Sequence, residues 1–272
     1  MFTIKNYVRA QSLEEAWTLN QKRSSRILGG MLWLKMGRGT VQTAIDLSDL
    51  GLDTIEETEE GFSIGAMVTL RQLEQHPGLN QYTQNAVEKA VRDIVGVQFR
   101  NLATLGGSLW GRFGFSDMLT VFLAMDCQVE LYKGGLIPLE TFLTMKHDRD
   151  ILVRVLVKKT PAHFAYTAMR IQRTDFPVLT CAVSDVGGVQ RAVIGARPNK
   201  AMLVKNEDGL PAEAFAEYAA QVVPTGSNMR GSAAYRTHLV QVLTQRAIAE
   251  MGGANCYGNC TEPQRENHQR PH

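Results

Sequence analysis

Two glycine pairs are the residues of this chain whose type and spacing are best suited to binding a ligand. One lies in Leu28-Gly29-Gly30-Met31 and the other in Thr104-Leu105-Gly106-Gly107-Ser108. Glycine lets the backbone take positive φ and lets a ligand approach without a Cβ in the way. Consecutive N–H groups in such a turn form a concave nest for an anion, strengthened where a helix begins just after it. Two nests at the ends of facing strands would hold the two charges of a dinucleotide pyrophosphate from both sides.

The second glycine loop carries more information than the first. Thr104 and Ser108 add hydroxyl donors around it, and Asp117 follows at the expected start of a helix. Asp117 would accept hydrogen bonds from sugar or ribityl hydroxyls. The alternative is that this carboxylate stabilises the positive end of its own helix dipole. Either glycine pair taken alone is more often an ordinary turn.

Other sequence signals of nucleotide or metal chemistry are missing. The chain contains neither a Rossmann G-x-G-x-x-G fingerprint nor a P-loop, so a nucleotide must be held by another fold. Cys256 and Cys260 have C-x-x-x-C spacing without a second pair to complete four ligands, and we expect no metal site. We expect Cys127 and Cys181 to be buried. The sequence shows no paired carboxylates and no nucleophile beside a base that would carry out acid–base chemistry.

Composition indicates a soluble globular protein. The 272 residues include 29 Lys plus Arg against 27 Asp plus Glu, a net charge of +2, and 44% are hydrophobic. Near-neutral charge argues against a dedicated nucleic-acid binder. No uncharged stretch approaches the roughly 20 apolar residues of a membrane span, and the N-terminus lacks the pattern of a secretory signal. We therefore expect a cytoplasmic protein with no membrane or nucleic-acid partner.

The elements that carry the first glycine loop are a mixture of short helices and strands. A capping box at Ser12-Leu13-Glu14-Glu15 predicts a helix over residues 13–22. Residues 26–28 read as a strand before the glycine pair, residues 31–36 as a short helix after it, and residues 44–47 as a second strand.

The elements around the second loop follow the same mixed pattern. Residues 54–66 predict a hairpin turned at Glu60-Gly61, and a capped helix begins at Thr69 and ends at Pro77-Gly78. A longer helix is expected over residues 80–95. Ser116 is the expected N-cap of a helix over residues 117–125, and residues 127–132 read as a strand.

From residue 164 onward the pattern changes to long strands followed by helices. Strands are predicted over residues 165–169, 178–184 and 189–196, the last two joined at Gly187-Gly188 as a tight hairpin. Helices are predicted over residues 211–222 and 232–251. An antiparallel sheet with helices on one face is the natural arrangement.

Three segments together resemble the FAD-binding subunit of molybdenum hydroxylases. They are the first glycine loop with its following residues, the run Phe99-Arg100-Asn101-Leu102-Ala103-Thr104-Leu105-Gly106-Gly107-Ser108-Leu109, and Ser116-Asp117. That family includes the xanthine dehydrogenase flavin domain and the medium subunit of carbon monoxide dehydrogenase. Residues 170–183 and 230–236 resemble the smaller C-terminal domain of these flavoproteins. The resemblance covers about residues 1–250.

The resemblance implies an α+β fold in two parts. The first is a two-lobed FAD-binding domain of the PCMH or carbon monoxide dehydrogenase flavoprotein type over residues 1–160, with lobes of about 1–55 and 56–160. A C-terminal domain with an antiparallel sheet and helices follows over residues 163–251. Residues 252–272, rich in polar residues, are expected to be a disordered tail.

The resemblance also implies a function and a site. The function is that of an FAD-binding, electron-transfer oxidoreductase subunit of a heteromeric complex, acting with a [2Fe-2S] small subunit and a molybdopterin large subunit and passing electrons to NAD or another acceptor. The FAD contacts carried over are Leu28, Gly29, Gly30, Met31, Leu32, Thr104, Gly106, Gly107, Ser108 and Asp117.

The sequence departs from the family pattern in three places. Met31-Leu32-Trp33 stands where Thr-Asp-Leu is common, Ser108 stands where Asn is common, and the usual proline before Ser116-Asp117 is missing. The first change removes polar side chains from the loop and keeps its backbone. This change therefore leaves open the alternative that the chain is a scaffold subunit with weak or lost FAD binding. A free-standing flavin reductase is the third alternative.

Overall fold

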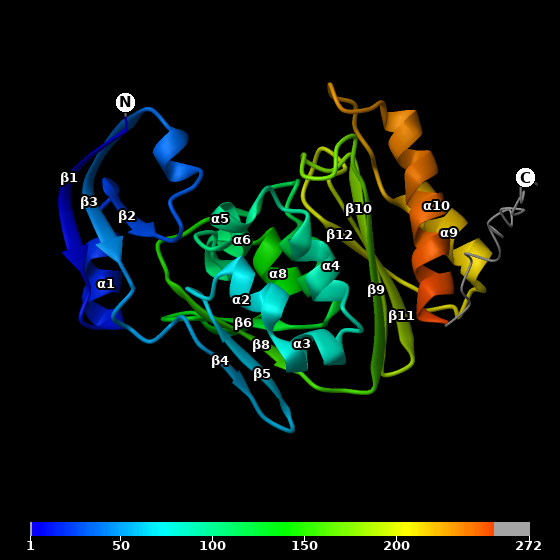
Figure 1. Ribbon diagram of the computed structural model, residues 1–272, viewed down its shortest axis with the longest axis horizontal. Helices are drawn as coiled ribbons and strands as arrows, with labels where there is room; N and C mark the ends of the chain where they lie inside the picture. The colour runs from blue at the N-terminus through cyan, green and yellow to red at the C-terminus, as the bar shows by residue number, and fades with distance from the viewer. Residues whose placement is uncertain (1, 253–272) are drawn as a thin grey trace, which may run out of the picture.

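The computed structural model describes residues 2–252, and these residues build three β-sheets that follow one another along the chain. Figure 1 shows the three sheets side by side along the long axis of the molecule, with helices between the second and third. The predicted α+β fold, a mixed helix-and-strand part followed by an antiparallel sheet with helices, is confirmed. None of the helices within residues 2–252 is long and apolar enough to cross a membrane.

The N-terminal sheet is small and entirely parallel. Its order is β1 (Phe2–Arg9), β3 (Gly39–Asp46) and β2 (Ser25–Leu28). Helix α1 (Leu13–Asn20) connects β1 to β2, and its Ser12 cap accepts the N–H of Glu15 as the capping box predicts.

The helix expected over residues 31–36 is wrong in its first half. Only the 3-10 turn η1 (Leu34–Met36) forms. Met31 has φ of +58°, and this left-handed backbone cannot belong to a right-handed helix.

The middle sheet is antiparallel and has the order β4-β5-β8-β6-β7. The predicted hairpin over residues 54–66 is confirmed. The strands, in that order, are β4 (Ile55–Glu57), β5 (Gly61–Gly65), β8 (Leu152–Lys158), β6 (Gln128–Leu131) and β7 (Gly135–Pro138).

Seven short helices accompany this sheet, and their apolar faces share its core. They are α2 (Leu70–Gln75), α3 (Pro77–Tyr82), α4 (Ala86–Arg92), α5 (Val97–Arg100), α6 (Leu105–Gly111), α7 (Asp117–Ala124) and α8 (Leu139–Thr144). Every residue of α7 is buried, and the predicted Ser116 cap is confirmed.

The prediction of a single helix over residues 80–95 is wrong. Gln84 and Asn85 have positive φ and separate α3 from α4. The helix that starts at Leu70 ends at Gln75, just before Pro77-Gly78 as predicted, and this pair also begins α3.

The C-terminal sheet is antiparallel with the order β12-β11-β10-β9. Its strands are β9 (Ala162–Met169), β10 (Leu179–Val186), β11 (Val189–Gly195) and β12 (Met202–Lys205). The hairpin at Gly187-Gly188 forms as predicted, both glycines having positive φ. Helices α9 (Ala212–Val222) and α10 (Ala233–Met251) cover the outer face, while α4 and α7 pack against the other.

A fully buried arginine on α10 organises the C-terminal domain. Arg236 donates hydrogen bonds to the carbonyls of Val178 (2.9 Å), Gly226 (2.7 Å) and Gly231 (2.6 Å) and to Oδ1 of Asn228 (2.7 Å). Burial lowers its pKa. One side chain thus ties the loop before α10 to the start of β10.

Replacing Arg236 with Met keeps most of the side-chain volume and leaves these carbonyls without their donor. We expect the free energy of unfolding to fall by about 2–4 kcal/mol, because several buried acceptors lose their hydrogen bonds together. Denaturant unfolding measures this. Arg246→Met, at an exposed position on the same helix, is the control; equal stability of the two variants would contradict the assigned role.

Candidate cofactor site

The first glycine loop follows β2 and lies directly against the second. A Cβ on Gly30 would lie 1.9 Å from the carbonyl oxygen of Leu102, so no other residue fits there without moving the backbone. A Cβ on Gly29 would lie 2.9 Å from Oγ1 of Thr104 and 3.8 Å from Cα of Gly107. The glycines therefore allow two backbone segments, from the N-terminal lobe and the helical layer, to touch.

The first loop also presents unpaired backbone donors. Within residues 2–252, the N–H groups of Gly30, Met31 and Leu32 donate to no protein acceptor. Gly30, Met31 and Leu32 are partly exposed, so water or a ligand can accept hydrogen bonds from these N–H groups. The left-handed backbone at Met31 curves the loop. This is the predicted nest, and it suits an anion.

The second glycine loop is built differently from the expected strand-end turn. It forms the first turn of α6, with Thr104 as the N-cap. The N–H groups of Leu105 and Gly106 donate to the carbonyls of Val68 and Ala66, both at 2.8 Å, and that of Gly107 donates to Oγ1 of Thr104 at 3.1 Å. These donors are used within the protein, so this loop offers a bare surface rather than a second set of free N–H groups.

The two glycines of the second loop have different surroundings. Gly106 is buried, and a Cβ there would lie 2.6 Å from the carbonyl oxygen of Ala66. Gly107 is exposed, and a Cβ there would meet only Oγ1 of Thr104, at 3.0 Å. Gly106 is therefore required by packing, whereas Gly107 leaves room for something outside the protein.

Two cavities adjoin at these loops, one of about 310 Å³ and one of about 490 Å³. Their shared lining residues are Arg26, Ile27, Gly29, Thr104, Gly107 and Trp110. The lining of the smaller cavity includes the polar residues Asn20, Ser25 and Asp148. The larger has an aromatic wall of Trp33, Phe99, Phe113 and Phe115. Their arrangement fits an elongated ligand with an anionic middle and two flat ends.

The structure brings all ten predicted site residues to these two cavities. The smaller is lined by Leu28, Gly29, Thr104, Gly106 and Gly107, and the larger by Gly29, Gly30, Met31, Leu32, Thr104, Gly107, Ser108 and Asp117. Sequence reasoning missed Trp110, which lines both, and residues 148–152, which line the smaller one. No local signal marks residues 148–152, because they reach the cavity only through the tertiary fold.

Asp117 is a buried link between the two parts of the fold. Its Oδ1 accepts hydrogen bonds from the hydroxyl of Tyr166 on β9 and from the guanidinium of Arg170 just after that strand. Burial raises the pKa of the Asp117 carboxyl, and the ion pair with Arg170 opposes that rise. Burial and the Asp117 charge raise the pKa of Tyr166 well above its usual range. The start of α7, which lines the larger cavity, is thereby fixed to the C-terminal domain.

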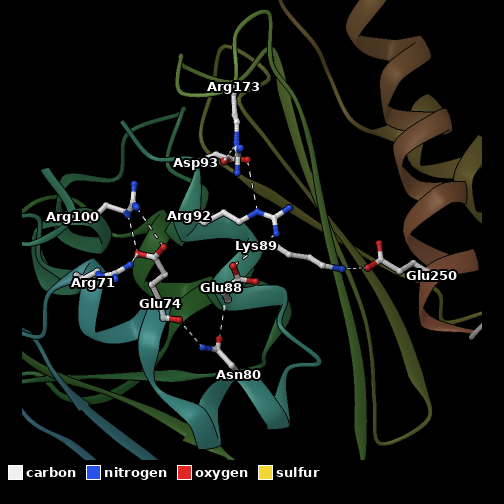
Figure 2. A network of polar contacts seen from close by, with 10 residues as sticks. All are labelled: Arg71, Glu74, Asn80, Glu88, Lys89, Arg92, Asp93, Arg100, Arg173 and Glu250. Atoms are coloured by element: carbon white, nitrogen blue, oxygen red, sulfur yellow. Dashed lines mark hydrogen bonds and ion pairs between the residues drawn. The ribbon is translucent and has the colours of Figure 1, made fainter. Parts of the chain in front are cut away.

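Arg100, in the sequence run that carries the family resemblance, donates a hydrogen bond to Ile94, a residue that lines the larger cavity. It is buried and donates to Glu74 through Nε at 2.9 Å, and its Nη1 donates to the carbonyl of Ile94 at 3.2 Å. Figure 2 shows Arg71 reaching the same Glu74 carboxylate. Sequence reasoning missed this pair, because its two members are 26 residues apart and meet only in the folded chain.

Exposed ion pairs also link α4 to the C-terminal domain (Figure 2). Lys89 pairs with Glu250 on α10, and Nε of Arg173 lies 2.8 Å from Asp93. Arg173 is 77% exposed. Such pairs contribute little, so the buried Asp117–Arg170 pair is the stronger polar link.

The described residues contain no cluster suited to a metal ion. Within residues 2–252, no three His, Cys, Asp or Glu side chains come together. Cys127 and Cys181 are buried, as expected, and burial raises the pKa of the Cys181 thiol to about 12. Cys256 and Cys260, with the predicted tail beyond Gly252, lie outside the described residues.

Comparison with known families identifies both parts of the chain. The FAD binding domain in molybdopterin dehydrogenase matches residues 2–159, and the CO dehydrogenase flavoprotein C-terminal domain matches residues 164–251. The chain belongs to this family of FAD-binding subunits of molybdenum hydroxylases. FAD is accordingly its cofactor, and the chain is an oxidoreductase subunit.

Individual relatives agree with this assignment along nearly their whole length. The chain is 28% identical to the nicotine 6-hydroxylase medium subunit of Paenarthrobacter nicotinovorans over 276 residues, 90% of this chain and 96% of the relative. It is 27% identical to the xanthine dehydrogenase FAD-binding subunit of Escherichia coli O157:H7 over 286 residues, 92% and 97% of the two chains.

Solved structures share the fold. A chain of carbon monoxide dehydrogenase from Hydrogenophaga pseudoflava superimposes with a TM-score of 0.80 at 20% identity, covering 92% of this chain and 97% of that one. A chain of quinoline 2-oxidoreductase from Pseudomonas putida 86 gives 0.80 at 22% identity, with the same coverage.

Replacing Asp117 with Ala tests the buried link. The change leaves the Arg170 charge buried without its partner, and we expect the free energy of unfolding to fall by about 3–5 kcal/mol. Arg173→Ala, which removes an exposed pair, should change the free energy of unfolding much less, because water screens that pair. Thermal and denaturant unfolding compare the two; similar losses in both variants would show that Asp117 does not hold the domains together.

Proposed function

We propose that this chain is the electron-relay subunit of a molybdenum hydroxylase complex and that its glycine loops hold FAD. The observation that supports the site most directly is the set of free N–H groups at Gly30, Met31 and Leu32. These residues line the larger cavity and directly follow Gly29, which lies against Gly107 and lines both cavities. These donors suit a pyrophosphate, and the cavities on either side suit two flat rings. When bound, FAD supplies the electron-transfer chemistry.

The chain's own residues bind and orient the cofactor. The N–H groups of the first loop would hold the phosphates. Thr104 and Ser108 line the same cavity, where the Ser108 hydroxyl donates to the carbonyl oxygen of Thr104 at 2.9 Å. The bare face of Gly107 allows the phosphate to approach the backbone. Asp117 is the proposed sugar or ribityl contact, because its Oδ2 accepts no hydrogen bond from another residue within 2–252 while Oδ1 holds Tyr166 and Arg170.

The proposed partners are a [2Fe-2S] small subunit and a molybdopterin large subunit, and the proposed acceptor is NAD or another carrier. A relative is named as a medium subunit, which supports a heteromeric complex. Two [2Fe-2S] clusters need about eight cysteine ligands, and the sequence has four cysteines. An electron source on another subunit is consistent with that count.

A scaffold subunit with weak FAD binding is the second candidate. Met31 and Leu32 place apolar side chains on the loop that would surround the phosphates. Only backbone groups of this loop then attract the pyrophosphate. Measured FAD affinity separates the two candidates.

Gly107→Val tests the site. We expect the purified wild-type protein to be yellow and to release FAD on denaturation. The variant should bind FAD at least about tenfold more weakly, because a branched side chain occupies the space left for the phosphate. Gly39→Val is the control, since Gly39 lies on an exposed strand position where a Cβ meets nothing within 4 Å. Unchanged FAD affinity in Gly107→Val would remove this loop from the site, and a wild-type chain that takes up no FAD would favour the scaffold.

The partner proposal is tested on the native protein. We expect the chain to purify with an iron-sulfur subunit and a larger molybdopterin subunit, detected by native mass measurement and metal analysis. If instead the chain is alone in its native extract and reduces an acceptor with NADH unaided, the free-standing flavin reductase replaces the relay subunit.

A further inference from the structure

Trp33 is the centre of an aromatic cluster at the larger cavity. Its ring centre lies 5.4 Å from Phe115, 5.7 Å from Phe176, 6.0 Å from Phe113 and 6.5 Å from Phe99. These rings come from the first glycine loop, α5, the segment between α6 and α7, and the C-terminal domain. Although four rings surround it, Trp33 remains 41% exposed.

Trp33 is the ring of this cluster best placed to meet a ligand. Phe113 and Phe115 stack on each other at 5.2 Å with an interplanar angle of 8°, so each has one face covered. The Phe176 ring is tilted by 32° relative to the Trp33 ring, and Phe176 is not among the residues that line the cavity. Trp33 lines the cavity and directly follows Leu32, whose N–H is unpaired.

The two cavities differ in volume and lining, and this difference indicates which end of FAD each would hold. The cavity of about 490 Å³ has the aromatic wall, whereas the lining of the cavity of about 310 Å³ includes one aromatic residue, Trp110. The three fused rings of a flavin are larger than adenine and require more space. The aromatic cavity is therefore the better fit for the flavin ring.

We propose that Trp33 is the wall against which the flavin ring lies, and that it positions the ring and quenches its fluorescence. This inference rests on the proposed FAD site. Aromatic rings in contact attract each other through offset or edge-on packing. An indole in contact with a photoexcited flavin transfers one electron to it, and that electron then returns, so emission is lost without net chemistry.

The test uses the full chain loaded with FAD and measures emission per bound flavin together with affinity. In Trp33→Leu we expect the emission to rise and the affinity to fall roughly three- to tenfold, the loss of one aromatic pair. Trp33→Phe keeps an aromatic ring without the indole, so its emission should rise while its affinity stays near wild type. If the Trp33→Leu variant does not fold, the emission of Trp33→Phe still tests the proposal.

Two control variants locate the effect. Trp17, which lies under Lys133 in a different part of the molecule, lines neither cavity, so Trp17→Phe should leave emission unchanged. Trp110 lines both cavities, and a rise in emission in Trp110→Phe without one in the Trp33 variants would overturn the proposal. So would FAD binding with equal emission and affinity in wild type and both Trp33 variants, and this outcome leaves the FAD site itself standing. A wild-type chain that binds no FAD overturns both.

Discussion

The approach of Gly30 to Leu102 is the constraint on which the rest of this structure depends. Two backbones meet where a Cβ would lie 1.9 Å from a carbonyl oxygen, so the N-terminal lobe can close on the helical layer only through glycine. That closure places Gly29 opposite Gly107 and joins the two cavities at one point. It also leaves the N–H groups of the first loop without protein partners. The site is therefore a product of how the lobes meet, and neither lobe contains it alone.

The C-terminal domain is held to this site by interactions of very different strength. The Asp117–Arg170 pair is buried on both sides and lies at the start of α7 beside the cavity, whereas Lys89–Glu250 and Arg173–Asp93 are partly or largely exposed. Breaking a buried pair is costly because it leaves an uncompensated charge, and exposed pairs are screened by water. A movement of β9 relative to α7 therefore cannot occur without disturbing the wall of the larger cavity.

Features that depend on local hydrogen bonds could be predicted from the sequence, and features that depend on distant residues could not. The caps at Ser12, Thr69 and Ser116 and the hairpin at Gly187-Gly188 each involve residues a few positions apart, and all form as predicted. The break between α3 and α4 falls at Gln84, whose Oε1 accepts the N–H of Phe164 at 2.8 Å, 80 residues away. In the same way the partners of Asp117 come from β9 and the residue after it. The glycine loops identified the residues around the cavities, but only the fold showed that the second loop uses its N–H groups internally.

The unpaired donors of the first loop have a consequence for the lifetime of the protein in a cell. These donors come together only where the folded chain holds Met31 in its left-handed conformation, so a ligand that pairs with them binds the folded chain alone. A ligand that binds only the folded chain adds stability that grows with its concentration, about 2.7 kcal/mol at a hundredfold excess over Kd. For a chain that takes up FAD at this loop, proteolytic turnover then depends on cofactor supply. Subunits made faster than FAD becomes available are the ones that proteases remove first.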